Sequence, residues 1–190
     1  MATAADPLFT ETMLNTIFEI YYDGVARMMD EVGDLLDVFI YWDDLSTQNG
    51  PMVSPRWFEK YLKPLYRRLF DLVKSRSQAK IFFHCCGAAR TWIPHLIDVG
   101  VDALNPVQTS AVDMDPAELK REFGSDITFW GGTVNPQGTL FCGTPQQVRD
   151  EARRSIEIFA PGGGFVFAGI HNILDEVPPE NIAALFETAL

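Results

Sequence analysis

The chain has 190 residues, and 47% of them are hydrophobic, which is enough material for one hydrophobic core. We therefore expect a single globular domain over residues 1–190. Its 26 acidic residues outnumber the 15 basic ones and give a net charge of −11, which argues against nucleic acid and anionic membranes as partners. No apolar run approaches the roughly 18 residues of a membrane span, and the first residues do not read as a secretory signal, so we expect a cytoplasmic protein.

Alternating helices and strands are predicted along the whole chain by the spacing of its apolar residues. Ser54-Pro55, Asp115-Pro116 and Thr144-Pro145 each pair a capping side chain with a proline, a pattern typical of helix starts. Such alternation predicts a parallel α/β sheet with right-handed crossovers. In chain order we expect helix 9–32, strand 37–42, helix 54–75, strand 80–84, helix 88–99, strand 101–105, a helix from 115, strand 127–130, helix 144–159, strand 164–168 and a last helix from 178.

Polar or glycine residues follow all five expected strands. In parallel α/β folds, ligands bind beyond the carboxyl ends of the strands, so this convergence predicts a functional site at that edge. Part of the convergence is the ordinary polarity of loops. The residues concerned are Asp43, Asp44 and Gln48; His84 and Cys86; Asn105 and Gln108; Gly131, Gly132 and Thr133; and His171 and Asn172.

Residues 80–87 read Lys-Ile-Phe-Phe-His-Cys-Cys-Gly and form the most informative segment. Side chains alternate along a strand, so His84 and Cys86 share a face while Cys85 points the other way. An imidazole and a thiolate side by side supply two of the three protein ligands of a catalytic zinc site. The alternative is that His84, Cys85 and Cys86 are ordinary buried core residues. The chain has three cysteines in all, and three cysteines do not make a disulfide framework.

The third zinc ligand has three candidates. His171 lies just beyond the fifth strand on the edge that holds His84, and we choose it for that position. Cys142 precedes a helix start in a loop that could reach the site, and we interpret it as a packed loop thiol. His95 lies within a helix among apolar residues, so we expect it on the outer surface.

Asp43 and Asp44 end the first strand, where a carboxylate can orient a metal-bound histidine, bind a substrate cation or act as a base. Alternation lets one of the two face the interior, and the alternative is an Asp pair that starts a turn. Gly131-Gly132 leaves room for a ligand to approach the backbone or, alternatively, only forms a turn.

The pattern resembles the uroporphyrinogen decarboxylase superfamily, which includes cobalamin-dependent methyltransferases of the methylcobamide:coenzyme M methyltransferase type. The resemblance covers nearly the whole chain and implies a TIM-type (β/α)8 barrel. The segments that carry it are Asp43-Asp44, Ser54-Pro55, Pro64, Phe83-His84-Cys85-Cys86-Gly87, Asn105-Pro106-Val107-Gln108, Trp130-Gly131-Gly132, Gly162-Gly163-Gly164-Phe165, His171-Asn172 and Pro178-Pro179-Glu180-Asn181.

Two branches of this superfamily differ in their ligands. The methyltransferase branch carries His-x-Cys and a distant Cys as zinc ligands; His84 and Cys86 match the first two, and His171 stands where the distant Cys falls. A histidine is itself a zinc ligand, so the site is retained with an altered charge. The decarboxylase branch lacks His-x-Cys, has a His near His171 and an Asp near Asp43, and binds its polycarboxylate substrate through arginines near its N-terminus at positions not present here.

The length points to an incomplete barrel. A (β/α)8 barrel usually needs about 250 residues, whereas we count five strands, so the chain resembles the C-terminal part of the family. Unpaired edges predict an oligomer or a complementary chain that supplies the missing strands.

The resemblance implies zinc-dependent methyl transfer between a corrinoid methyl donor, methylcobalamin either free or on a partner protein, and a small thiol. His84, Cys86 and His171 would bind zinc, and Asp43 and Asp44 would be catalytic. The alternatives are decarboxylation of uroporphyrinogen III, with Asp43 and His171 against the tetrapyrrole, or a non-catalytic corrinoid- or tetrapyrrole-binding partner. The expected substrate-binding residues are Gln48, Asn105, Gln108, Gly131, Gly132 and Asn172.

Overall fold

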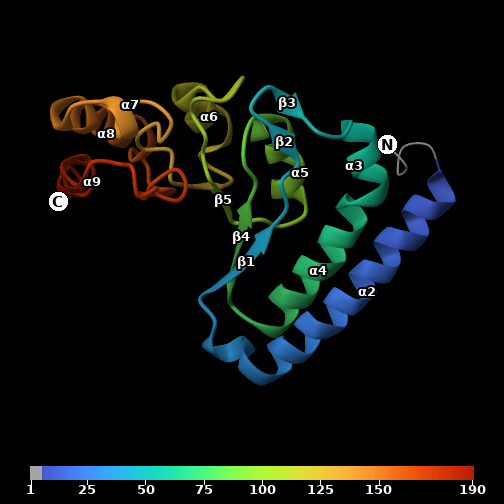
Figure 1. Ribbon diagram of the computed structural model, residues 1–190. Helices are drawn as coiled ribbons and strands as arrows, with labels where there is room; N and C mark the ends of the chain where they lie inside the picture. Colours follow the sequence, from blue (N-terminus) through green and yellow to red (C-terminus); the bar gives the residue numbers. More distant parts are fainter. Residues whose placement is uncertain (1–5) are drawn as a thin grey trace.

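A computed structural model describes residues 6–190 and shows a five-stranded parallel sheet with flanking helices (Figure 1). The strand order is β1-β4-β5-β6-β7, so strands that follow one another around the sheet also follow one another in the chain. This confirms the predicted α/β fold, an incomplete TIM-type barrel. The strands are β1 Val38–Trp42, β4 Lys80–His84, β5 Ala103–Asn105, β6 Thr128–Trp130 and β7 Phe165–Val166.

Apart from a short helix at Thr139–Cys142, the helices fall where the sequence predicts them, with two interruptions. The helix expected over 54–75 is divided at Leu62, because Pro64 occupies the first turn of the second part and has no N–H to continue the first. Pro94 similarly follows a short 3-10 turn, η2, at the start of α5. The helices are α2 Pro7–Val32, α3 Pro55–Tyr61, α4 Lys63–Arg76, α5 Ile93–Asp98, α6 Pro116–Phe123, α7 Thr139–Cys142, α8 Pro145–Phe159 and α9 Pro179–Glu187, with 3-10 turns η1 Gly33–Leu35 and η2 Ala89–Trp92.

The three predicted helix caps are all formed. The side chains of Ser54, Asp115 and Thr144 each accept a hydrogen bond from the backbone N–H three residues later. At Thr144 the bond is reciprocal, since the side chain of Gln147 accepts from the Thr144 N–H at 2.8 Å. These caps fix where α3, α6 and α8 begin after their strands.

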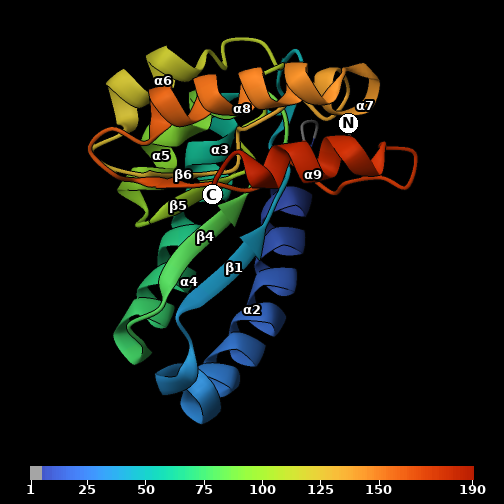
Figure 2. The same cartoon turned by 90° about the vertical axis from the view of Figure 1, so that its left-hand side faces the viewer.

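The two faces of the sheet differ in what covers them. Figure 2 shows α2 and α4 running along one side of β1 and β4. On that side Ile81, Phe83 and Cys85 are fully buried in the core. On the opposite face Ile40 and Trp42 of β1 remain 51% and 72% exposed. The exposed apolar face is therefore the concave one, which forms the interior in a closed barrel.

Three features were not predicted. The loop expected around Cys142 contains the short helix α7. A short hairpin, β2 Ser46–Thr47 with β3 Gly50–Pro51, lies beyond the carboxyl end of β1. The last strand is shorter than the expected 164–168, and it forms one edge of the sheet as β1 forms the other. Among the described helices, none has the length and apolar character needed to cross a membrane.

Candidate metal centre

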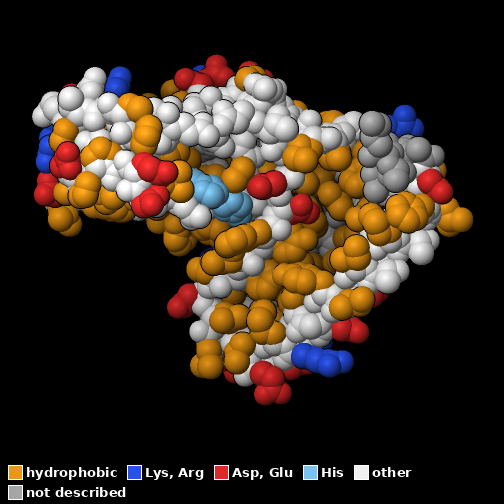
Figure 3. Space-filling view, in the orientation of Figure 1, with side chains coloured by type: hydrophobic (Ala, Val, Ile, Leu, Met, Phe, Trp, Pro, Cys, Tyr) orange, Lys and Arg blue, Asp and Glu red, His pale blue; other side chains and the backbone are white. Residues whose placement is uncertain are grey.

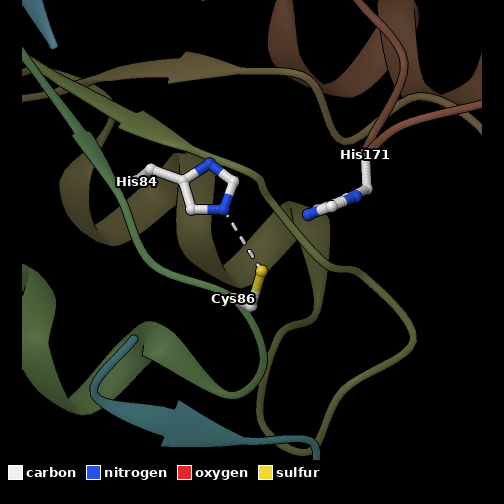
Figure 4. A group of neighbouring side chains, drawn as sticks. All are labelled: His84, Cys86 and His171. Atoms are coloured by element: carbon white, nitrogen blue, oxygen red, sulfur yellow. Dashed lines mark hydrogen bonds between the residues drawn. The ribbon is translucent and has the colours of Figure 1, made fainter. Parts of the chain in front are cut away.

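His84, Cys86 and His171 come together at the carboxyl edge of the sheet (Figure 4). His84 is the last residue of β4, Cys86 follows two residues later, and His171 lies in the loop after β7. Their ligand atoms all lie within 4.8 Å of one another, and Cys86 Sγ is 3.3 Å from His84 Nε2. The three residues chosen from the sequence as zinc ligands thus form a single cluster.

The orientation of His84 is set by Asn105 at the end of β5. The Asn105 amide nitrogen donates to the Trp130 carbonyl at 3.0 Å, so the amide oxygen must face His84 Nδ1, 2.8 Å away. An oxygen acceptor at that distance requires a proton on Nδ1. In the neutral ring, the other nitrogen, Nε2, then carries the lone pair, and it points toward Cys86. This is the arrangement in which a second residue fixes the tautomer of a metal-ligating histidine.

The loop that carries Cys86 is held on three sides. The Cys86 N–H donates to Asp44 Oδ1 at 2.8 Å, and the Gly87 N–H donates to Gln108 Oε1 at 2.9 Å. Gly87 has a φ of +79°, and a Cβ there would lie 2.4 Å from the Thr47 carbonyl oxygen of the hairpin. Only glycine fits this close approach, which places the hairpin directly against the candidate metal loop.

Burial and the neighbouring carboxylate of Asp44 raise the pKa of Cys86 to about 11. The thiol is consequently protonated at neutral pH, with its Sγ 3.3 Å from His84 Nε2. A thiolate here needs a compensating cation, and metal binding to such a group releases the thiol proton.

The three side chains fit a zinc ion. Zn–N bonds of about 2.0–2.1 Å and a Zn–S bond of about 2.3 Å place ligand atoms about 3.4–3.6 Å apart in a tetrahedron. Cys86 Sγ and His84 Nε2, at 3.3 Å, are already close to this separation. The His171 side chain is exposed and its ligand atom already lies within 4.8 Å of the other two, so a small movement of this side chain suffices to reach the tetrahedral separation. Two imidazoles and one thiolate also leave a fourth position for substrate.

The other thiols and the third histidine lie outside the cluster. Cys85 is fully buried on the helix side of β4, where its sulfur accepts from the Leu45 N–H at 3.4 Å. Cys142 is exposed at the end of α7, so its interpretation as a packed loop thiol was wrong. His95 lies on α5, with its ring 5.5 Å from that of Phe58. None of these three belongs to the group that could hold a metal among the described residues.

The two adjacent aspartates point in different directions. Asp43 accepts a hydrogen bond from the Tyr66 hydroxyl on α4, and burial raises the pKa of its carboxyl while this hydrogen bond partly opposes the rise. Asp44 instead supports the backbone of Cys86. Asp44 is thus a positioning residue at the candidate centre, whereas Asp43 belongs to the contact between β1 and α4. Catalytic roles for both stay predictions.

Two cavities adjoin the cluster. The first, of about 570 Å³, is lined by Cys86 and His171 together with three of the expected substrate-binding residues, Gln48, Gln108 and Asn172. Gln48 also donates to Gln137 at 2.8 Å, which links the hairpin to the loop after β6. The second cavity, of about 270 Å³, lies on the concave face against His84, Asn105 and His171. Figure 3 shows histidine side chains at this hollow surface, with carboxylates beside them.

Gly131 and Gly132 are buried at the end of β6, with φ values of +96° and +80°. A Cβ at Gly131 would lie 3.1 Å from the Gly169 carbonyl oxygen, and one at Gly132 would lie 2.9 Å from Val107 Cβ. Both glycines therefore allow close packing between neighbouring strand ends. Neither lines the two cavities, so a role in substrate binding stays a prediction.

Sequence reasoning missed two aromatic contacts, one at the centre and one between Tyr66 and Asp43. The Trp42 ring lies 5.3 Å from the His84 ring, because Trp42 pairs with His84 in the register of β1 and β4. The sequence contained a signal for this pair, because Trp42 and His84 are each the last residue of an expected strand. Neighbouring parallel strands that end together place their last residues side by side on the same face. The Tyr66 contact with Asp43 spans a helix and a strand, and no local pattern indicates it.

The uroporphyrinogen decarboxylase (URO-D) family model matches residues 2–190. The chain belongs to this family. Its relatives include uroporphyrinogen decarboxylases from Pseudoalteromonas translucida, 25% identical over 98% of this chain and 49% of the relative, and from an Azoarcus species, 29% identical over 93% and 47%. The chain thus spans about half the length of these uroporphyrinogen decarboxylases.

A solved structure with the same fold comes from a second kind of protein. A methyltransferase from Methanosarcina mazei superposes with a TM-score of 0.72 at 22% identity, covering 98% of this chain and 50% of the methyltransferase. The chain therefore has sequence relatives named for one reaction and a structural neighbour named for another, so the residues at the site must distinguish between the two reactions.

Proposed function

We propose that this chain takes part in methyl transfer from a corrinoid to a thiol at a zinc site formed by His84, Cys86 and His171. The observation that carries the proposal is the cluster itself, whose ligand atoms lie within 4.8 Å of one another. The fixed tautomer of His84 supports it, since a structural histidine does not need a free nitrogen facing a thiol.

A bound zinc ion would lower the pKa of an acceptor thiol and so supply a thiolate at neutral pH. In the reaction, the thiol sulfur bonds to the methyl carbon as the methyl–corrinoid bond breaks; the electron pair stays with the corrinoid, and the thiol proton goes to solvent. The chain's residues position these groups. Asn105 holds the His84 ring, Asp44 holds the Cys86 backbone, and the amides of Gln108 and Asn172 face the cavity beside Cys86.

Decarboxylation of uroporphyrinogen is the second candidate, and the names of the relatives favour it. In that reading Asp43 and His171 contact the tetrapyrrole together. Asp43, however, bonds to Tyr66 and lines a groove against α2, while His171 lines the two cavities beside Cys86. This separation favours methyl transfer. A non-catalytic corrinoid- or tetrapyrrole-binding partner is the third candidate.

Turnover distinguishes the three candidates. Zinc-loaded protein should demethylate methylcobalamin in the presence of a thiol, followed by the change in its visible absorption, and Cys86→Ala should abolish this while Cys142→Ser retains it. Decarboxylation of uroporphyrinogen by the same preparation would instead support the second candidate. Binding of methylcobalamin without turnover of either substrate would support the third.

A further inference from the structure

The charges around the candidate centre are distributed unevenly. All 15 basic residues lie on helices or 3-10 turns or at the first position of β4, and none lies within the segments that directly follow the strand ends. Those segments, residues 43–54, 85–88, 106–115, 131–144 and 167–178, carry carboxylates instead. The carboxylates are Asp43, Asp44, Asp113, Asp115, Asp175 and Glu176. The ligand-binding edge of this half of the barrel is therefore negative.

The cavity beside Cys86 and His171 has a largely apolar wall. Its volume of about 570 Å³ lies in the range of small-molecule sites, about 300–1,000 Å³. Glu176 is the one acidic residue in its lining. Leu174 and Phe141 remain 64% and 45% exposed there, so the wall presents apolar surface to a ligand. The apolar side chains are Leu140, Phe141, Ile170, Ile173, Leu174 and Val177.

An anionic ligand is disfavoured in this cavity for two reasons. Its charge would lose hydration against the apolar wall, and it would lie near the carboxylates of Glu176 and Asp44. An uncharged ligand avoids both costs and gains from burial of its apolar surface. The amides of Gln48, Gln108 and Asn172 offer neutral hydrogen-bonding groups that fit such a ligand.

We propose that this cavity takes a neutral, largely apolar thiol and the methyl thioether made from it. This rests on the proposed function, because it names the class of thiol that accepts the methyl group. It contrasts with a polycarboxylate or a sulfonated thiol, whose acidic groups would find no lysine or arginine among the residues that line this cavity.

Three probes with a common body test the proposal: benzyl methyl sulfide, its 4-carboxylate and its 4-aminomethyl derivative. Binding is measured by NMR titration of the full chain without metal, so the readout is independent of zinc and of turnover. The neutral sulfide should bind about tenfold more tightly than the carboxylate, because the carboxylate is repelled by Glu176 and solvent only partly screens this repulsion. Equal or tighter binding of the carboxylate or the amine, or no binding of any probe, would overturn the proposal.

A charge placed in the wall provides the second arm. Leu174→Lys adds a cation beside the cavity at a mostly exposed position, so the fold should tolerate it, and it should reduce the preference for the neutral sulfide to less than about threefold. Leu35→Lys is the matched control, because Leu35 is 79% exposed on η1 and outside the cavity. An unchanged preference in Leu174→Lys would place the probe elsewhere. Zinc content is measured separately, so loss of the metal site and a wrong ligand class give different results.

Discussion

Asn105 decides which nitrogen of His84 can bind a metal. Its amide is oriented by the Trp130 carbonyl, and its oxygen then requires a proton on His84 Nδ1. From the sequence, we expected Asn105 to bind substrate. Its two hydrogen bonds make it a positioning residue, and it also lines the cavity on the concave face, so its role in substrate binding stays a prediction.

We predict that Asn105→Ala lowers zinc affinity by about 10- to 100-fold, because the His84 ring loses the group that fixes its tautomer. Affinity is measured by competition with a chelating indicator, and ¹⁵N chemical shifts of His84 report the tautomer directly. Asn172→Ala is the control, since Asn172 lines the same cavity as His84, whereas the partner of His84 Nδ1 is Asn105. Equal losses in both variants, or an unchanged tautomer in Asn105→Ala, would argue against the positioning role.

The adjacent cysteines should differ in their effect on metal binding. Cys86→Ser should remove zinc, because Sγ faces His84, whereas Cys85→Ser should keep it, because that sulfur contacts the Leu45 N–H on the helix side. Metal content of the two purified variants provides the measurement. If the results were reversed, the face assigned to each side chain would be wrong.

At the residue scale, alternation along β4 was sufficient to separate Cys86 from Cys85, and position beyond β7 was sufficient to choose His171. Strand alternation did not determine the roles of Asp43 and Asp44, because both lie past the end of β1 where the chain turns into the hairpin. The role of Asn105 depends on a carbonyl of another strand, which no local pattern contains.

At the scale of elements, the hairpin β2–β3 positions the candidate metal loop. The Ala88 N–H donates to the Thr47 carbonyl at 2.9 Å, and the Ser46 hydroxyl donates to the Ala88 carbonyl at 3.0 Å. Gly87 allows this contact. The sequence did not predict the hairpin, since residues 43–54 show no alternation of apolar and polar residues long enough to indicate strands.

We predict that Gly87→Ala destabilises the protein by about 3 kcal/mol, because a positive φ and a collision with the Thr47 carbonyl act together. Gly162→Ala is a matched control, since Gly162 has the same φ of +79° with nothing within 4 Å of its added Cβ, and it should cost about 1 kcal/mol. Denaturant unfolding measures both. Equal losses would show that the hairpin does not press on this loop.

The helix pattern was predicted well, because capping residues and prolines act locally. Thr144 and Gln147 form the capping box that their spacing indicated. Pro64 was a sequence signal for the break at Leu62, but the helical spacing of apolar residues continues across this break, so one helix was predicted. The length of β7 was less predictable, since strand length depends on which neighbours pair with it.

At the scale of the whole molecule, the sheet has an open edge at β1 beside an apolar groove. The groove has a volume of about 620 Å³, and α2 contributes Ile17 and Tyr21, which are 59% and 43% exposed. Because the chain spans about half of its relatives, we propose that the preceding strands and helices of the same barrel cover this groove, on the same polypeptide or on another chain.

The chain alone should therefore self-associate through this groove. We predict oligomers in sedimentation velocity, and Ile17→Glu should shift them toward the monomer because it places a charge in the apolar groove. Leu35→Glu, at a 79% exposed position outside the groove, should leave the oligomers unchanged. A compact monomer with a cooperative thermal transition would contradict the prediction.

Zinc content of the purified chain tests the central claim most directly. Elemental analysis should find about one zinc per chain, because His84, Cys86 and His171 supply three protein ligands, and dialysis against a chelator should remove it. His84→Ala and His171→Ala should each lose the metal, while Cys142→Ser should retain it. Wild-type protein that remains without zinc after incubation with the metal, or a His171→Ala variant that binds it as tightly, would contradict the account.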